Sequence, residues 1–333
     1  MQPTSTISFS ERLLKWWSVH GRKELPWQTK PRSAYHIWIA EIMLQQTQVS
    51  TVIPYYQSFF KHFPDLYTLA ISSVDDVLAQ WSGLGYYQRA RNLHRCAKIC
   101  VAEHQSQLPM NAEALNHLPG IGPSTANAIV SQSTDKVLPI LDGNVKRWLA
   151  RYAGISGWPG KTAISKQLWQ AAESLLPDTN GANYTQACMD LGAMVCHRNK
   201  PDCQNCPVRY DCFALHQNQI EQLPGKKPKR HVPSKTIHLL LQQKSDEVLL
   251  IQRPPTGIWG GLWCLPIFDE APVNARFIGE FSHQLTHLHM RLHLWKKTFT
   301  AQTINEANQR WFTLENALQV GLPKPIRTII EAL

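Results

Sequence analysis

The chain has 333 residues, of which 43% are hydrophobic, and its 34 Lys and Arg exceed its 24 Asp and Glu by 10. A chain of this length is longer than one hydrophobic core usually organises, so it predicts two or more domains. The positive balance favours a polyanionic partner, although a basic protein without nucleic acid has the same composition. No apolar run approaches the ~18 residues of a membrane span, and the first residues lack a secretory pattern, so we expect a cytoplasmic protein.

Residues 9 to about 195 carry apolar side chains at three- and four-residue spacing, as in AYHIWIAEIMLQQTQVSTVI (34–53). This spacing is typical of amphipathic helices, and prolines such as Pro54 are expected to separate them. The pattern predicts a bundle of about ten helices.

The composition changes after this bundle. Residues 216–235 are predicted to form a linker, because Lys, Arg and Pro dominate its second half and keep it stiff and solvated. Strand-like segments at 236–243, 247–254, 261–268 and 290–299 then precede a helical end at 325–333. The predicted fold class is a mainly α region at 1–215 followed by an α+β domain at 236–333.

The stretch LPGIGPSTANAIV (118–130) places a proline and two glycines between two helical segments, in a predicted hairpin spanning about 111–130. Gly120 and Gly122 would let the backbone reach positive φ and approach another molecule closely. The free amides of the following helix could then bind a phosphate. A plain turn without a ligand is the alternative.

Two carboxyl groups have unusual surroundings. On its predicted helix, Glu41 is flanked by Ile37 and Leu44, so burial should raise its pKa and suit it to general acid catalysis. A solvated glutamate on a helix face is the alternative. Asp142 directly precedes a helix, where an aspartate is also an ordinary N-cap.

A third segment, WSGLGYYQRARNLHRCA (81–97), combines a glycine turn with Tyr86, Tyr87 and several arginines. Aromatic and basic side chains on one turn are typical of base stacking beside phosphate contacts. Packing of the tyrosines in the core is the alternative.

Half of the eight cysteines lie close together, at Cys196, Cys203, Cys206 and Cys212. In a reducing compartment, this grouping indicates a metal centre rather than disulfides. Zinc and an iron–sulfur cluster both accept four thiolates, so the spacing leaves both open.

Taken together, these motifs resemble the helix-hairpin-helix DNA glycosylase superfamily and, within it, the adenine glycosylases of the MutY type. The resemblance covers nearly the whole chain, with the motifs in the same order. The matching stretches are EIMLQQTQV (41–49), GLGYY (83–87), LPGIG (118–122), ILDGNVKR (140–147), DLGAM (190–194) and the four cysteines.

The resemblance implies an enzyme that flips adenine out of a mispair with 8-oxoguanine or guanine in duplex DNA and hydrolyses its N-glycosidic bond. Glu41 would be the general acid and base, Asp142 would stabilise the positively charged sugar, and Asn144 would assist Asp142. The cysteine loop at 196–212 would hold a [4Fe–4S] cluster. We expect a monomer that binds DNA in the nucleoid, with other repair proteins as further partners.

The resemblance also implies which residues contact DNA. Trp27, Leu44 and Gln186 would line the adenine pocket. Gln46 and Tyr86 would wedge into the duplex, and Thr47 would contact 8-oxoguanine. The hairpin would contribute Gly120, Gly122 and Ser124.

The C-terminal domain resembles the Nudix-like domain of this family, whose implied role is recognition of 8-oxoguanine. It lacks the Glu-rich metal box of Nudix hydrolases, so pyrophosphate hydrolysis is not expected. The family's Phe-Ser-His recognition loop aligns with Leu285, Thr286 and His287, and the first two residues depart from it. Thr286 keeps a hydroxyl and His287 keeps the imidazole.

Two rival functions stay open at this point. An endonuclease III-type enzyme acts on oxidised pyrimidines with a lysine that forms a Schiff base, and this chain has Ser124 at the corresponding position. Serine cannot form an imine, so we expect little or no strand cleavage. A catalytically inactive damage-binding protein is the other rival, although it would not need Glu41 and Asp142.

Overall fold

The computed structural model describes residues 7–28, 30–228, 231–286, 288–298 and 308–333. The chain divides into two compact units, Met1–Gln57 with Cys96–Pro228 and Ser58–Arg95 with Lys229–Leu333. The predicted fold class, a mainly α region followed by a C-terminal domain with a sheet, is confirmed. Among the described residues, no helix combines the length and the apolar character needed to cross a bilayer.

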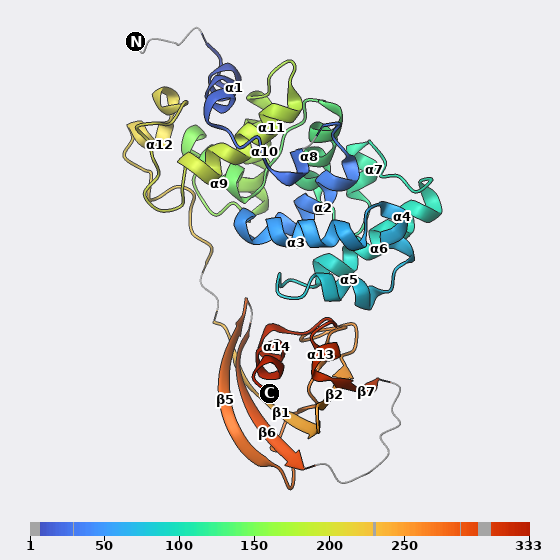
Figure 1. Cartoon of the computed structure of the whole chain (residues 1–333). Helices are drawn as coiled ribbons and strands as arrows, with labels where there is room; N and C mark the ends of the chain where they lie inside the picture. The colour runs from blue at the N-terminus through green and yellow to red at the C-terminus, as the bar shows by residue number, and fades with distance from the viewer. Residues whose placement is uncertain (1–6, 29, 229–230, 287, 299–307) are drawn as a thin grey trace. The chain divides into compact units, whose positions relative to one another are not determined.

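The first unit is helical (Figure 1). The boundaries between the units fall within two helices, α3 (Val49–His62) and α6 (Gln88–Glu103). The remaining elements of the first unit are α1 (Phe9–His20), η1 (Pro26–Gln28), α2 (Ala34–Leu44), α7 (Ala112–Asn116), α8 (Pro123–Thr134), α9 (Gly143–Ala153), α10 (Thr162–Ser174), α11 (Gly181–Asp190), the π-helical turn η2 (Leu191–Val195), η3 (Arg209–Asp211) and α12 (Phe213–His216).

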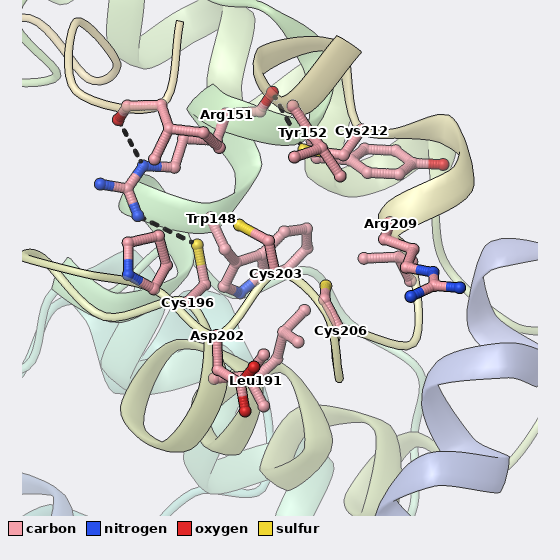
Figure 2. A pocket seen from close by; sticks show the side chains of 15 residues that line it. Trp148, Arg151, Tyr152, Leu191, Cys196, Asp202, Cys203, Cys206, Arg209 and Cys212 are labelled. Carbon is pink, nitrogen blue, oxygen red and sulfur yellow. Dashed lines mark hydrogen bonds between the residues drawn. The ribbon is translucent and has the colours of Figure 1, made fainter. Parts of the chain in front are cut away.

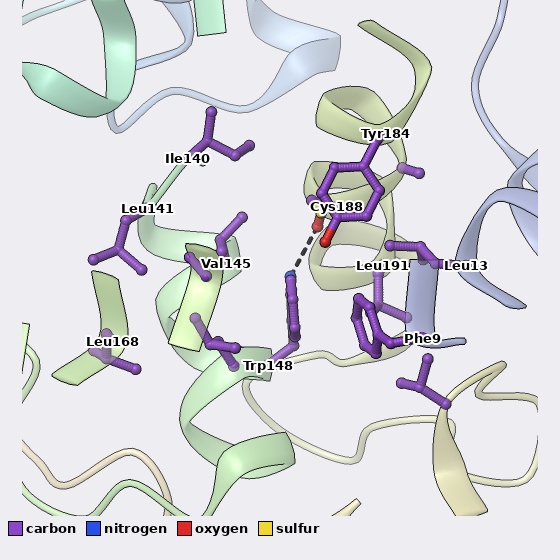
Figure 3. Packing of buried hydrophobic residues seen from close by; sticks show 14 of the residues in the cluster. Phe9, Leu13, Ile140, Leu141, Val145, Trp148, Leu168, Tyr184, Cys188 and Leu191 are labelled. Atoms are coloured by element: carbon purple, nitrogen blue, oxygen red, sulfur yellow. Dashed lines mark hydrogen bonds between the residues drawn. The ribbon is translucent and has the colours of Figure 1, made fainter. Parts of the chain in front are cut away.

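A buried core joins α1, α9 and α11 (Figure 3). Trp148 of α9 lies at its centre, with its ring 5.4 Å from that of Phe9 and its indole N–H donating to the Cys188 carbonyl at 2.9 Å. Val145 and Leu149 of α9 are buried in the same cluster. Because one whole face of α9 is packed, the start of this helix has a fixed position.

The second unit contains the sheet. Its strand order is β3-β2-β1-β6-β5, with β4 paired to β1 and β7 paired to β2, and β1 runs parallel to β6. The elements are α4 (Leu66–Ile71), α5 (Val74–Gln80), β1 (Ser234–Lys244), β2 (Glu247–Gln252), β3 (Trp263–Cys264), β4 (Ile267–Phe268), β5 (Arg276–Leu285), β6 (Leu288–Thr298), β7 (Gln309–Thr313), α13 (Leu314–Ala317) and α14 (Lys324–Glu331).

Hydrogen bonds explain why Ser58–Arg95 groups with the C-terminal domain. The Tyr87 hydroxyl donates to the Leu322 carbonyl at 2.9 Å, and the Gln252 amide donates to Asp75 at 2.7 Å. Arg91 also donates to the Gly260 carbonyl. The turn that carries Tyr86 therefore belongs to the same compact unit as the sheet, a grouping that the sequence did not predict.

Two other features differ from the sequence prediction. Helix α3 continues through Pro54, where a break was expected, because Ser50 is exposed and water can satisfy the carbonyl that loses its N–H partner. Strands β5 and β7 were not predicted. Along β5 most side chains are at least partly exposed, so the alternation that identifies a half-buried strand is missing.

Candidate active site

A cavity of about 590 Å³ in the first unit is lined by residues of α2, η1, α8, α9, α11 and η2. Its volume lies within the range of small-molecule sites. Of the residues predicted to act on adenine or DNA, the cavity brings together Trp27, Glu41, Leu44, Thr47, Ser124, Asp142, Asn144 and Gln186.

Glu41 lies on α2 between buried neighbours, and its side chain reaches the cavity. The pKa of Glu41 is raised to about 7, because burial and, to a smaller extent, the negative charge of Asp142 raise it more than the Gln132 amide at 2.9 Å lowers it. The expectation of a raised pKa is therefore met. A carboxyl with a pKa near neutrality can exchange a proton under physiological conditions.

Asp142 is the N-cap of α9, so the plain structural interpretation of this residue is correct. The Val145 N–H donates to Asp142 Oδ1 at 2.7 Å, and the Asn144 amide lies 3.3 Å from Oδ2. Burial raises the pKa of Asp142, while these hydrogen bonds and the positive charge of Arg147 favour its charged form. The capping role leaves the carboxyl facing the cavity, so it does not exclude a role in chemistry.

Arg147 connects the start of α9 to the π-helical turn. Its guanidinium donates to Asn144 Oδ1 at 3.0 Å, to the Gly192 carbonyl at 2.7 Å and to the Cys196 carbonyl at 2.8 Å. π-Helical turns are frequent at functional sites, and this one contributes Gly192 and Ala193 to the cavity wall. Asn144 is consequently held beside Asp142.

The far wall of the cavity combines an aromatic ring with an amide. Trp27 is 3% exposed and its ring contacts Tyr56 edge-on at 5.4 Å. The Gln186 amide donates to Asp190 at 2.8 Å, and its buried carbonyl oxygen has no hydrogen-bond partner among the described residues.

The hairpin of α7 and α8 leads directly into the cavity. Gly120 has a φ of 82°, as predicted, whereas Gly122 has a φ of −97°, so only one of the two glycines is needed for a left-handed backbone. Gly122 instead caps α8, and a Cβ there would meet nothing within 4 Å. The Ser124 hydroxyl, one residue into the helix from Pro123, accepts from the Leu141 N–H at 2.9 Å.

The remaining predicted DNA contacts lie outside the cavity. Gln46 is exposed at the end of α2 with a φ of 61°. Tyr86 belongs to the second unit, is 47% exposed and has a φ of 48°. Thr286 is exposed in the turn between β5 and β6, and His287 lies outside the described residues.

The arginine nearest to Tyr86 stabilises its turn. The Arg89 guanidinium lies over the rings of Trp81 and Tyr86 and donates to the Gly85 carbonyl at 3.1 Å. Burial lowers the pKa of Arg89 to about 10. Arg89 therefore makes its contacts within the protein. Tyr86 is the exposed aromatic side chain of this segment.

The four clustered cysteines surround a second, small cavity (Figure 2). Its other lining residues are mostly apolar, and they include Trp148, Leu191 and Val208. Arg151 Nη1 lies 3.3 Å from Cys196 Sγ, and the Cys212 thiol donates to the Arg151 carbonyl at 3.8 Å. Burial raises the pKa of Cys203 and Cys212, and it raises that of Cys206 to about 12.

This donor set fits a cofactor with several metal atoms. In the described part of the chain, no three His, Cys, Asp or Glu side chains are arranged to hold a single metal ion, yet four thiols line one mostly apolar cavity. A cluster reaches thiols on different walls, whereas a tetrahedral zinc ion requires all four sulfur atoms near one point. The arginine beside Cys196 would partly offset the negative charge of four thiolates.

Three functional candidates were missed in the sequence. Gln132, Arg147 and Asp190 contact residues of the cavity but belong to no chemical motif by themselves. Asp190 is fully buried and also accepts from Trp17 at 3.0 Å and from the Arg22 backbone at 2.9 Å. Arg147 and Asp190 lie in the matching stretches ILDGNVKR and DLGAM, where no role was predicted for them, and Gln132 was marked only as a polar residue within an apolar helical stretch.

Both parts of the chain match known protein families. Residues 39–174 match the family described as HhH-GPD superfamily base excision DNA repair protein, and residues 237–332 match the NUDIX domain. The chain is 38% identical to the adenine DNA glycosylase of Buchnera aphidicola subsp. Acyrthosiphon pisum, and the alignment covers 97% of each chain.

Solved structures resemble the helical part. The structure of a thermostable thymine-DNA glycosylase superposes with a TM-score of 0.57 at 27% identity, covering 63% of this chain and 95% of that one. A non-covalent endonuclease III–DNA complex superposes with a TM-score of 0.53, covering 63% and 94%. At 18% identity the second likeness concerns the fold alone.

Proposed function

The chain belongs to the adenine DNA glycosylase family, and we propose that it excises adenine mispaired with 8-oxoguanine or guanine from duplex DNA. Excision of this adenine would prevent G:C to T:A transversions. The observation that carries the proposal is the pair of carboxyl groups, Glu41 and Asp142, that come from distant parts of the chain and line one cavity.

The two carboxyl groups suit the two halves of N-glycoside hydrolysis. With a pKa near 7, Glu41 is available in the protonated form to give its proton to the departing adenine and afterwards to take a proton from water. Asp142 would face the sugar, where positive charge develops as the bond breaks, and Asn144 would keep it oriented. This is the two-carboxylate logic of glycosidases applied to a nucleoside.

Use of this cavity requires that the base leave the duplex, because an adenine stacked between its neighbours cannot enter it. Trp27 and Leu44 would contact the flipped ring, and Gln186 would form part of the same pocket wall. The amide of Gln186 is fixed by Asp190, so the direction of its carbonyl is set before the base arrives.

Contacts to the rest of the duplex would come from exposed residues. Gln46 and Tyr86 both have exposed side chains on left-handed backbone, a strained arrangement that is common at functional sites and suits a wedge. Thr47 would contact 8-oxoguanine, and Thr286 with His287 would recognise it from the C-terminal domain. The open space at Gly122 would admit a phosphate close to the start of α8, beside Gly120.

Base removal without strand cleavage is expected from the lining of the cavity. Cleavage by Schiff-base chemistry needs an amine, and no lysine lines this cavity in the described part of the chain. Ser124 lies there instead, with its hydroxyl engaged by the Leu141 N–H. This observation disfavours the endonuclease III-type alternative.

Single-turnover assays on defined duplexes test the function. We expect adenine release from 8-oxoguanine:A and from G:A, with strands that break only after alkali because the abasic sugar is left intact. A duplex with thymine glycol serves as the control substrate and should remain uncut. Cutting of thymine glycol with adenine left in place would contradict the proposal and support the endonuclease III-type rival.

We also propose that Cys196, Cys203, Cys206 and Cys212 hold a [4Fe–4S] cluster. Bound there, the cluster would supply a rigid, electron-rich cross-link between the segments that carry the four thiols. Trp148, Leu191 and Val208 would shield the cluster from water. Arg151 would place its positive charge beside Cys196.

Metal analysis of the purified protein tests the cluster. We expect about four iron and four sulfide per chain with a brown colour, and Cys206→Ser should lower the iron content severalfold because one ligand is lost. Cys264→Ala is the matched control, because this buried cysteine lies on β3 in the other unit and should leave iron unchanged. One zinc per chain without iron would contradict the assignment.

A further inference from the structure

The hydrogen bond to the Glu41 side chain comes from Gln132, which lies 91 residues further along the chain. Gln132 Nε2 lies 2.9 Å from Glu41 Oε1. The glutamine is on α8, which packs against α2, and it is only 4% exposed. A buried amide destabilises a core unless its polar atoms are paired, so this contact explains why a glutamine is accommodated here.

The backbone of Gln132 is anchored independently of its side chain. Arg32 Nη1 donates to the Gln132 carbonyl at 3.2 Å, and Arg32 Nη2 donates to Asn183 Oδ1 at 3.0 Å. This carbonyl lies in the last turn of α8, where the helix dipole favours a cation. The contact fixes the end of α8 against α11 and thereby fixes the origin of the Gln132 side chain.

The chemistry of an amide decides which oxygen of Glu41 can carry a proton. An amide N–H only donates, so the Glu41 oxygen that it contacts acts as an acceptor. When Glu41 is protonated, Oε1 is therefore its carbonyl oxygen and the proton is on Oε2. The same bond is stronger with a carboxylate than with an acid, so it favours the ionised form and opposes the effect of burial.

We propose that Gln132 is a positioning residue for Glu41, which occupies Oε1 and leaves Oε2 to carry the proton that adenine receives. The inference rests on the proposed role of Glu41 as general acid. In that step the proton passes from Oε2 to the base while the electron pair of the C1′–N9 bond goes to adenine. Water then adds to the cationic sugar, and its proton returns to the carboxylate.

The pH profile of the Gln132→Met variant tests this inference. Methionine keeps most of the volume but has no donor, so Glu41 loses a bond that favours its carboxylate. In single-turnover adenine release, the fall in rate at high pH should move upward by about half a unit to one unit. The maximal rate should drop about tenfold because the carboxyl is less well oriented. Ser133→Ala, the next residue on α8, should leave both quantities unchanged.

Infrared difference spectra give a readout that does not depend on turnover or on one variant. Spectra referenced to Glu41→Gln report the protonated carboxyl of Glu41, and its titration can be followed in the wild type, in Gln132→Met and in Gln132→Asn, whose amide is too short to reach. A higher midpoint in either folded variant supports the proposal. Identical midpoints overturn it.

The two proposals fail in different ways. Wild-type turnover in Glu41→Gln would show that the proposed function of this residue is wrong. An inactive Glu41→Gln together with a Gln132→Met protein that titrates like the wild type would overturn the role of Gln132 alone.

Discussion

Replacement of Glu41 by glutamine is expected to reduce single-turnover adenine release by about a hundredfold to ten-thousandfold, the usual contribution of a positioned general acid. Glutamine has nearly the same shape and can still accept a hydrogen bond from Gln132, so the cavity should keep its form. Binding to an 8-oxoguanine:A duplex should persist, because the exposed contact residues are untouched. Gel shifts on the same protein sample measure this binding.

If Glu41 acts as the general acid, adenine release by the wild type should also depend on pH. The acid form of Glu41 predominates below its pKa of about 7, so release should be fastest there and should decline about tenfold per unit above it. Glu173→Gln, an exposed glutamate on α10, is the matched control and should retain full activity. If Glu41→Gln releases adenine as fast as Glu173→Gln, the protein does not use this carboxyl as an acid.

Replacement of Asp142 by asparagine is expected to lower adenine release by about a hundredfold to a thousandfold, because the negative charge opposite the cationic sugar is lost. Asparagine is as good an N-cap as aspartate, so α9 should be unaffected. The variant therefore removes the charge and keeps the helix start. Thermal unfolding and single-turnover release, measured side by side, separate the two roles of this residue.

Asp142→Ala completes the comparison, because alanine removes both the charge and the cap. It should lose activity to the same extent as Asp142→Asn and, in addition, about 1 kcal/mol of stability. Full activity in Asp142→Asn, with a loss confined to the stability of Asp142→Ala, would leave this residue with the N-cap role only. The inactive damage-binding protein would then regain support.

The residues proposed for the chemistry could be selected from the sequence because each lies in a short local pattern. Glu41 is surrounded by apolar neighbours within one turn of its helix, and Asp142 directly precedes a helix start. Four cysteines within one loop need no long-range information to be grouped. What these patterns could not supply is that Glu41 and Asp142 line the same cavity, which depends on how α2 and α9 pack.

The residues that contact these groups could not be predicted from the sequence, because the contacts depend only on tertiary structure. Gln132 contacts Glu41 only because α8 packs against α2, and a glutamine within a helix does not by itself indicate such a contact in the sequence. The grouping of Ser58–Arg95 with the C-terminal domain was missed for a similar reason. Tyr87 and Arg91 reach the backbone carbonyls of Leu322 and Gly260, and every residue offers such an acceptor.

Helix α9 has a consequence for how the protein would respond to its surroundings. Asp142 and Asn144 at its start line the cavity that contains Glu41, and Arg151 in its last turn lines the cysteine cavity, about 13 Å from Asp142 along the axis. One short helix therefore connects the candidate active site to the four thiols. We expect loss of the proposed cluster, or oxidation of these thiols, to displace the start of α9 and thereby lower adenine release.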